Sequence, residues 1–155
     1  MREKTVCFAG YSIIPHQDYP KVKARLEAAI IDLISKGYTD FVAGGDIGFH
    51  TFAAQTVLRL KKDYTEIKLH LVLPARNYMD GWSKAVIASH QKILQNADEV
   101  EYISDKCKRS SIRRRNQRLV DMSSACICFL LKRTGGAAYT VRYARTKKLQ
   151  IISII

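Results

Sequence analysis

Short apolar runs alternate with longer segments of helical period along the whole of this chain. The expected strands, in order, are residues 4–10, 39–46, 67–74, 99–104, 124–131 and 149–155. The expected helices between them are residues 19–37, 47–64, 83–97, 111–123 and 137–147. A regular alternation of strands and helices predicts an α/β fold, in which helices cover both faces of a mostly parallel sheet. We therefore expect a three-layer domain.

The size and composition of the chain fit one such domain. A chain of 155 residues with 47% hydrophobic content can build one substantial core, and no linker, repeat or low-complexity tract divides it. We predict a single domain over residues 1–155. The formal net charge of +12 indicates a surface that attracts polyanions or phosphate-bearing ligands, although charge says nothing about the fold.

The sequence predicts neither a membrane segment nor a metal site. The N-terminus lacks the apolar stretch of a secretory signal, and no apolar run approaches the roughly 18 residues needed to cross a bilayer. Cys7, Cys126 and Cys128 fall in strand-like runs and Cys107 in a basic loop, so disulfide and zinc-ligand spacings are absent. We expect a cytoplasmic protein with reduced thiols, no metal and no membrane partner.

Glycine gathers where the expected strands lead into helices. The glycines at these turns are Gly10, then Gly44, Gly45 and Gly48, and finally Gly135 and Gly136. In a parallel sheet, ligands bind beyond the carboxyl ends of the strands, and the free N–H groups at a helix start suit a phosphate. We predict that these turns approach a phosphate-bearing ligand. The alternative is that they are helix-entry turns without a ligand, because glycine is common in turns.

Four segments, in this order and at this spacing, resemble one known group of proteins. They are GGDIGFHTFAA (44–54), PARNYMDGW (74–82), RRNQRLVDMSS (114–124) and TGGAAYTVRYA (134–144). Together they are similar to the SLOG superfamily, the Rossmann-like group that includes DprA/Smf and LOG proteins, and within it to the YpsA-like branch. The resemblance covers nearly the whole chain. It implies a Rossmann-like sheet and a pocket for a nucleotide or a nucleotide-derived molecule.

The expected helix over residues 111–123 carries two polar residues on its apolar side. Helical spacing places Arg115 and Asn116 near the apolar stripe, so both should point inward. An inward guanidinium suits a phosphate or carboxylate, and the amide can hold a sugar hydroxyl or a loop carbonyl. The alternative is that Arg115 pairs with Asp46 or Asp121 as a structural contact, and spacing alone leaves both readings open.

The sequence departs from the LOG enzymes, which cleave the N-glycosidic bond of nucleoside monophosphates. Their glycine loop has the pattern G-G-x-G-T-x-x-E, and the same register here puts Arg142 at the position of the glutamate. A cation there cannot act as a carboxylate base or stabilise positive charge on the sugar. Motifs for a serine nucleophile, a P-loop and G-x-G-x-x-G are also absent. We therefore assign no catalytic residue.

Polar side chains at the glycine turns complete the predicted ligand site. Asp46 is a candidate acceptor for ribose, and His50 stands where YpsA-like proteins commonly have an acid. Tyr11 can stack on a base, and Thr134 and Thr140 can offer hydroxyls to phosphate. The full predicted set is Gly10, Tyr11, Ser12, Gly44, Gly45, Asp46, Gly48, His50, Arg115, Asn116, Thr134, Gly135, Gly136 and Thr140. The only expected cofactor is a nucleotide-type ligand.

Three other functions stay open. DprA relatives handle single-stranded DNA, and the basic runs over 106–118 and 142–148 suit a nucleic-acid backbone. A nucleic-acid-binding module is therefore the main alternative to a nucleotide-binding sensor or regulator, and a LOG-like phosphoribohydrolase is the third. A structural or regulatory protein with a vestigial pocket is also open, as is a homodimer, because relatives of this type often form dimers.

Overall fold

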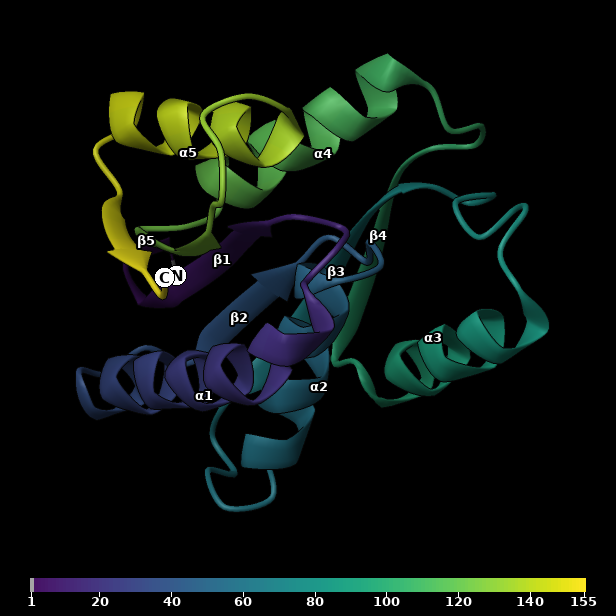
Figure 1. Ribbon diagram of the computed structural model, residues 1–155. Coiled ribbons are helices and arrows are strands. Elements are labelled where there is room, and N and C mark those ends of the chain that lie inside the picture. Colours follow the sequence, from purple (N-terminus) through teal and green to yellow (C-terminus); the bar gives the residue numbers. More distant parts are fainter. Residues whose placement is uncertain (1) are drawn as a thin grey trace.

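A computed structural model describes residues 2–155 as a six-stranded sheet between two layers of helices (Figure 1). The strands are Thr5–Gly10 (β1), Asp40–Ala43 (β2), Lys68–Ala75 (β3), Glu99–Ser104 (β4), Ala125–Phe129 (β5) and Gln150–Ser153 (β6). The helices are Tyr19–Ser35 (α1), Phe49–Leu60 (α2), Lys84–Asn96 (α3), Arg109–Asp121 (α4) and Gly136–Thr146 (α5), with short 3-10 turns at Arg2–Lys4 (η1) and His16–Asp18 (η2). All neighbouring strands are parallel, so the predicted Rossmann-like α/β fold is confirmed.

The order of the strands places a topological switch point between β1 and β5. The order is β4-β3-β2-β1-β5-β6, so the chain first builds outward from β1 to β4 and then returns to place β5 on the other side of β1. The return runs through α4, which packs on β3, β4 and β1. The loops after β1 and β5 therefore diverge to opposite faces of the sheet, and such a switch point is where open α/β sheets bind ligands.

Two apolar cores fix the helices on the two faces of the sheet (Figure 1). Helices α1, α2 and α3 cover one face, and α4 and α5 cover the other. The sequence explains why helices cover both faces. The continuous apolar runs of β1 and β5 are typical of strands in a parallel sheet that is covered on both faces, and both strands are buried along almost their whole length. The amphipathic face of α1 is equally regular, with Val22, Leu26, Ile30 and Leu33 buried at helical spacing.

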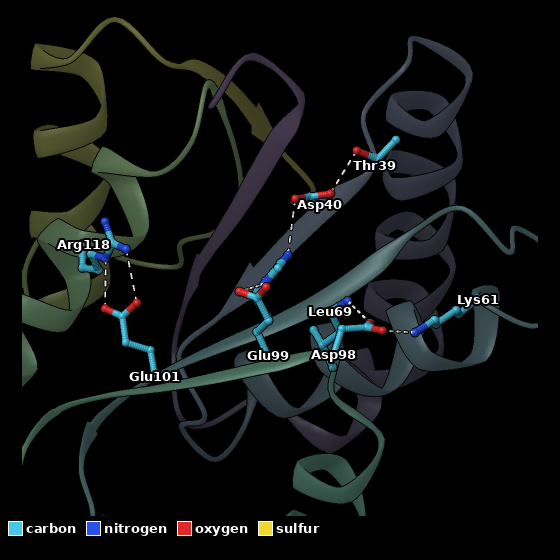
Figure 2. A network of polar contacts seen from close by, with 9 residues as sticks. Thr39, Asp40, Lys61, Leu69, Asp98, Glu99, Glu101 and Arg118 are labelled. Carbon is cyan, nitrogen blue, oxygen red and sulfur yellow. Dashed lines mark hydrogen bonds and ion pairs between the residues drawn. The ribbon is translucent and has the colours of Figure 1, made fainter. Parts of the chain in front are cut away.

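Charged contacts fasten the edge strand β4 to its neighbours (Figure 2). The Asp98 carboxylate, just before β4, accepts a hydrogen bond of 2.8 Å from the Leu69 amide and pairs with the Lys61 ammonium. Farther along β4, Arg118 of α4 donates two hydrogen bonds of 3.0 and 3.2 Å to the Glu101 carboxylate. These contacts lie away from the glycine turns and have a structural role.

The four cysteines lie in the strands and the loop that the sequence predicts for them. Cys7, Cys126 and Cys128 are buried in β1 and β5, and Cys107 is exposed. Within residues 2–155, no helix has the length and apolar character needed to span a membrane.

Candidate ligand-binding site

A buried arginine holds the second glycine loop, residues 44–48. Arg115 is only 1% exposed, and its guanidinium donates to the Gly44 carbonyl at 2.6 Å and to both carboxylate oxygens of Asp46 at 2.8 and 3.1 Å. Its Nε donates to the Asn116 side-chain oxygen at 2.8 Å. Both α4 side chains point inward as predicted, and Arg115 makes the pairing with Asp46 that the sequence had left open as the structural alternative. A contact of either residue with a ligand stays a prediction.

Two histidines complete the support of this loop. The Gly44 amide donates to Nδ1 of His50 at 3.0 Å, so the proton of the neutral imidazole lies on Nε2. Nε2 of His90, on α3, lies 2.9 Å from the Gly45 carbonyl oxygen and 3.2 Å from the Thr51 hydroxyl. Helices α2, α3 and α4 therefore each contribute one side chain that fixes the backbone of residues 44–48.

The electrostatics of the loop follow from its burial. Burial lowers the pKa of His50 to about 4, and the nearby Asp46 charge offsets only part of that effect, so His50 is neutral at pH 7. Burial alone would raise the pKa of Asp46, but the Arg115 charge and its hydrogen bonds, together with the histidines, hold this pKa below its ordinary value. The loop thus contains one ion pair and a neutral imidazole.

Four of the predicted glycines are required by internal packing. A Cβ atom on Gly10 would overlap the Phe49 ring, and one on Gly44 would press on the Arg115 guanidinium. Gly45 and Gly48 have positive φ of 81° and 91°, which favours glycine by itself. A Cβ atom on Gly45 would also overlap Leu73, and one on Gly48 would overlap the carbonyl oxygen of Ser12. The space beside these four residues is already occupied by the protein itself.

The first loop, after β1, is bound to both of the other glycine turns. The Tyr11 carbonyl accepts a hydrogen bond of 3.0 Å from the Phe49 amide at the start of α2. The Tyr11 hydroxyl donates to the Lys132 carbonyl at 2.6 Å and accepts from the Lys132 amide at 2.7 Å. Tyr11 therefore joins the loops after β1 and β5 across the switch point, and its predicted stacking on a base is not tested.

The third glycine turn differs from the other two because its glycines border open space. Gly135 has φ of 96° and forms the N-cap of α5, and no side chain in the described part of the chain makes a cap hydrogen bond to this helix. Among residues 2–155, a Cβ atom on Gly136 would meet no heavy atom within 4 Å, and one on Gly135 would meet only the Lys132 side chain, at 4.0 Å. The first amides of an α-helix have no acceptor within the helix. At the start of α5, Gly135 and Gly136 are both exposed.

The two predicted threonines have different surroundings at this turn. Thr140 is buried, and its hydroxyl donates to the Gly136 carbonyl at 2.8 Å, a bond within α5. Thr134 is exposed immediately before Gly135. Thr134 is thus the better placed of the two to offer a hydroxyl to an anion at the turn.

Sequence reasoning missed several residues that the fold brings close to the second loop. Tyr78 is buried beside Gly45, its hydroxyl has no hydrogen-bond partner among residues 2–155, and burial raises its pKa to about 12. The Trp82 ring packs on the His90 ring at 4.6 Å between centroids. The only sequence signal for these residues was the PARNYMDGW segment. His90 carried no signal, because its contact with Gly45 joins residues far apart in the chain.

The sequence of the turn, residues 132–142, contains no aspartate or glutamate. Arg142, in the register of the LOG glutamate, is exposed on α5 and donates to the Arg133 carbonyl at 3.1 Å. Among the residues that the structure describes, no group of three or more His, Cys, Asp or Glu side chains is arranged to hold a metal ion.

The chain is similar over nearly its full length to solved structures of DNA processing protein A (DprA). The Streptococcus pneumoniae protein matches with a TM-score of 0.70 and 15% identity, over 97% of this chain and 50% of that one. The Helicobacter pylori protein, solved in a study of its single-stranded DNA binding mode, matches with a TM-score of 0.68 and 13% identity, over 96% of this chain and 64% of that one. At these identities the likeness shows the fold alone.

Sequence relatives carry the description UPF0398 protein. One from Halalkalibacterium halodurans is 25% identical over 138 residues, which is 87% of this chain and 73% of that protein. Relatives from Oenococcus oeni and Staphylococcus saprophyticus are 28% and 30% identical, and the chain spans 57% of the length of each. The sequence model of YpsA, described as "YspA SLOG family", matches residues 14–152. This chain therefore belongs to the YpsA family of SLOG proteins.

Proposed function

We propose that this protein binds a phosphate-bearing nucleotide or nucleotide-like metabolite at the turn between β5 and α5, as a sensor or regulator that does not turn its ligand over. The observation that carries the proposal is the open space beside Gly135 and Gly136 at the uncapped start of α5. Backbone amides and the helix dipole favour an anion at that point. The position at the switch point of the sheet supports the same reading.

The absence of turnover in the proposal rests on the residues around the turn. Arg142 replaces the carboxylate that LOG chemistry uses, and the carboxylate of Asp46 is already bound by Arg115 in the neighbouring loop. An oxocarbenium-like sugar would find cations rather than a carboxylate near the turn.

Thermal unfolding in the presence of nucleoside monophosphates, ADP-ribose, NAD and ribose 5-phosphate tests the proposal. A ligand at about 100 times its Kd stabilises the fold by roughly 2.7 kcal/mol, which raises Tm by a few degrees. In Gly136→Asp the added carboxylate stabilises α5 through the helix dipole but repels phosphate, so Tm should stay unchanged or rise while the ligand response disappears.

Ala85→Asp is the matched control, because it adds the same charge near the start of α3, at an exposed position. This variant should keep the ligand response of the wild type. A Gly136→Asp protein that is folded and binds its ligand with unchanged affinity would show that the turn is not the phosphate site.

Single-stranded nucleic acid is the second candidate ligand. Its support is the net charge of +12, the fold shared with the Helicobacter pylori protein, and Arg113 and Arg114 on α4. Both arginines are exposed and form no ion pair within residues 2–155. Binding to a phosphate backbone weakens steeply with salt, whereas a nucleotide in a formed pocket is less salt-dependent. A Tm shift with a short oligonucleotide at low salt only, and none with any nucleotide, would favour this alternative.

A further inference from the structure

A cleft lies beside the glycine turn, between the β5–α5 connection and α5. Figure 1 shows this connection rising from the end of β5 alongside α5. Between them is a cavity of about 620 Å³, which we call the cationic cleft. Its cations are Lys132 and Arg133 from the connection and Arg142 and Arg145 from α5. Gly135 and Gly136 do not line it, so the cleft adjoins the turn proposed above but is lined by different residues.

The four cations of the cleft have no anionic partner in the part of the chain that the structure describes. The residues lining the cleft include no carboxylate, and none of the four cations takes part in an ion pair. Arg142 and Arg145 are three residues apart on one helix, where like charges repel each other. This repulsion destabilises the ligand-free protein, and a bound polyanion would neutralise it.

The walls of the cleft are held in place before any ligand arrives. Both backbone polar groups of Lys132 are hydrogen-bonded to the Tyr11 hydroxyl, at 2.6 and 2.7 Å. The Arg133 carbonyl is fixed to α5 by the Arg142 guanidinium at 3.1 Å. Pre-ordered walls reduce the entropy that binding must overcome.

The floor of the cleft is apolar, which strengthens the electrostatic attraction between the cations above it and an anion. Ala138 and Val141 line the cleft and are 3% and 1% exposed, and Leu130 lies beside them. Charges next to a low-dielectric surface interact more strongly with an anion than charges surrounded by water. Three of the four cations are arginines, and guanidinium groups bind phosphate oxygens in pairs of hydrogen bonds.

We propose that the cationic cleft binds an oligophosphate chain, a diphosphate or longer. A chain of two or three phosphates carries roughly the charge of the four cations, whereas orthophosphate can engage only some of them at once. The volume is that of a small-molecule site, and the lining holds no aromatic ring on which bases of single-stranded DNA could stack. The chain could belong to a nucleotide or to free polyphosphate, because the chemistry that the cleft recognises is the same.

Calorimetric titration of the full chain with orthophosphate, pyrophosphate, tripolyphosphate and ATP, without divalent cations and at about 150 mM salt, tests the proposal. We expect Kd to fall steadily from orthophosphate to tripolyphosphate. The variant Arg142→Gln/Arg145→Gln should bind tripolyphosphate at least about tenfold more weakly, since it loses half of the cations. Both side chains are exposed, so the variant should fold.

Arg113→Gln/Arg114→Gln on α4 is the matched control, with the same change in net charge at two exposed arginines. It should bind tripolyphosphate within about twofold of the wild type. Equal losses in the two variants, or no loss in the cleft variant, would overturn the proposal, as would cleft-dependent binding of an oligonucleotide without binding of tripolyphosphate.

The same titrations separate the cleft from the glycine turn. The proposed function fails if no nucleotide binds in a manner that Gly136→Asp abolishes, and the cleft can still bind tripolyphosphate in that case. Equal affinity for ATP and tripolyphosphate would support recognition of the phosphate chain alone. Tighter binding of ATP, lost in the cleft variant, would support recognition of a nucleotide through that chain.

Discussion

Replacing Arg115 with methionine should destabilise this protein more than any exposed charge substitution on the same helix. Arg115→Met keeps an apolar stem of similar length but removes the guanidinium that binds the Gly44 carbonyl and the Asp46 carboxylate. Truncating one partner of a buried ion pair costs about 3–5 kcal/mol, because the other charge is left without compensation. The Asp46 side chain is 41% exposed, so water compensates it in part and the lower end, about 3 kcal/mol, applies.

Arg118→Met is the matched control, because it makes the same substitution one turn later on α4. The Arg118 side chain is 47% exposed, and its pairing with Glu101 is visible at the edge of the sheet in Figure 2. Exposed ion pairs contribute roughly 0–1 kcal/mol, so this variant should lose less than about 1 kcal/mol. The comparison holds the residue type and the change of net charge constant while burial differs.

Urea unfolding at pH 7 measures both variants, with the free energy of unfolding taken from linear extrapolation. A double variant with Asp46→Asn tests the pairing itself, since the loss from Arg115→Met should be smaller once the carboxylate is gone. If Arg115→Met loses less than about 1 kcal/mol, or no more than Arg118→Met, then the Arg115–Asp46 pair does not hold the loop.

Two further predictions concern the glycine and histidine positions. Gly48→Ala should cost at least about 2 kcal/mol in urea unfolding, because φ of 91° is strained for alanine and its Cβ would overlap Ser12. Gly136→Ala should be neutral or stabilising by roughly 0.5 kcal/mol, since nothing lies within 4 Å of the new Cβ; equal losses would contradict this contrast. His50 has a pKa of about 4 against about 6.5 when unfolded, so its contribution is complete above pH 6.5 and is lost as pH falls toward 4. Between pH 8 and 5 the loss should be about 2 kcal/mol, absent in His50→Gln, and NMR titration of the imidazole that finds a pKa near 6.5 would refute it.

The fold could be predicted from the sequence because its signals are local. The buried strand runs, the amphipathic period of α1 and the glycine turns each depend on neighbouring residues, and their alternation alone indicates a parallel sheet. The ends of the elements shifted by a few residues, as in α2, where the predicted 47–64 became Phe49–Leu60.

The reasons for the individual site residues could not be predicted, because they depend on contacts between distant segments. Gly44 and Arg115 are separated by 71 residues, and only the folded chain shows that one must lack a Cβ to admit the other. The sequence did not distinguish His90 from an ordinary exposed or packed histidine, because its contact with the Gly45 carbonyl exists only once α3 has packed beside the second loop. The inward direction of Arg115 was predictable from helical spacing. Spacing left Asp46 and Asp121 open as its partner, and only the folded chain selects Asp46.

The structure separates two roles that glycine plays at the carboxyl edge of this sheet. At residues 44–48 the missing side chains make room for the protein's own groups, which bind most of the polar atoms of the loop. At Gly135 and Gly136 the missing side chains leave room that no part of residues 2–155 fills. A loop tied by three helices is suited to keep the switch point rigid, and a bare turn beside unpaired cations is suited to meet an anion. Ligand affinity should therefore respond to substitutions at the third turn, whereas substitutions in the second loop should act mainly through stability.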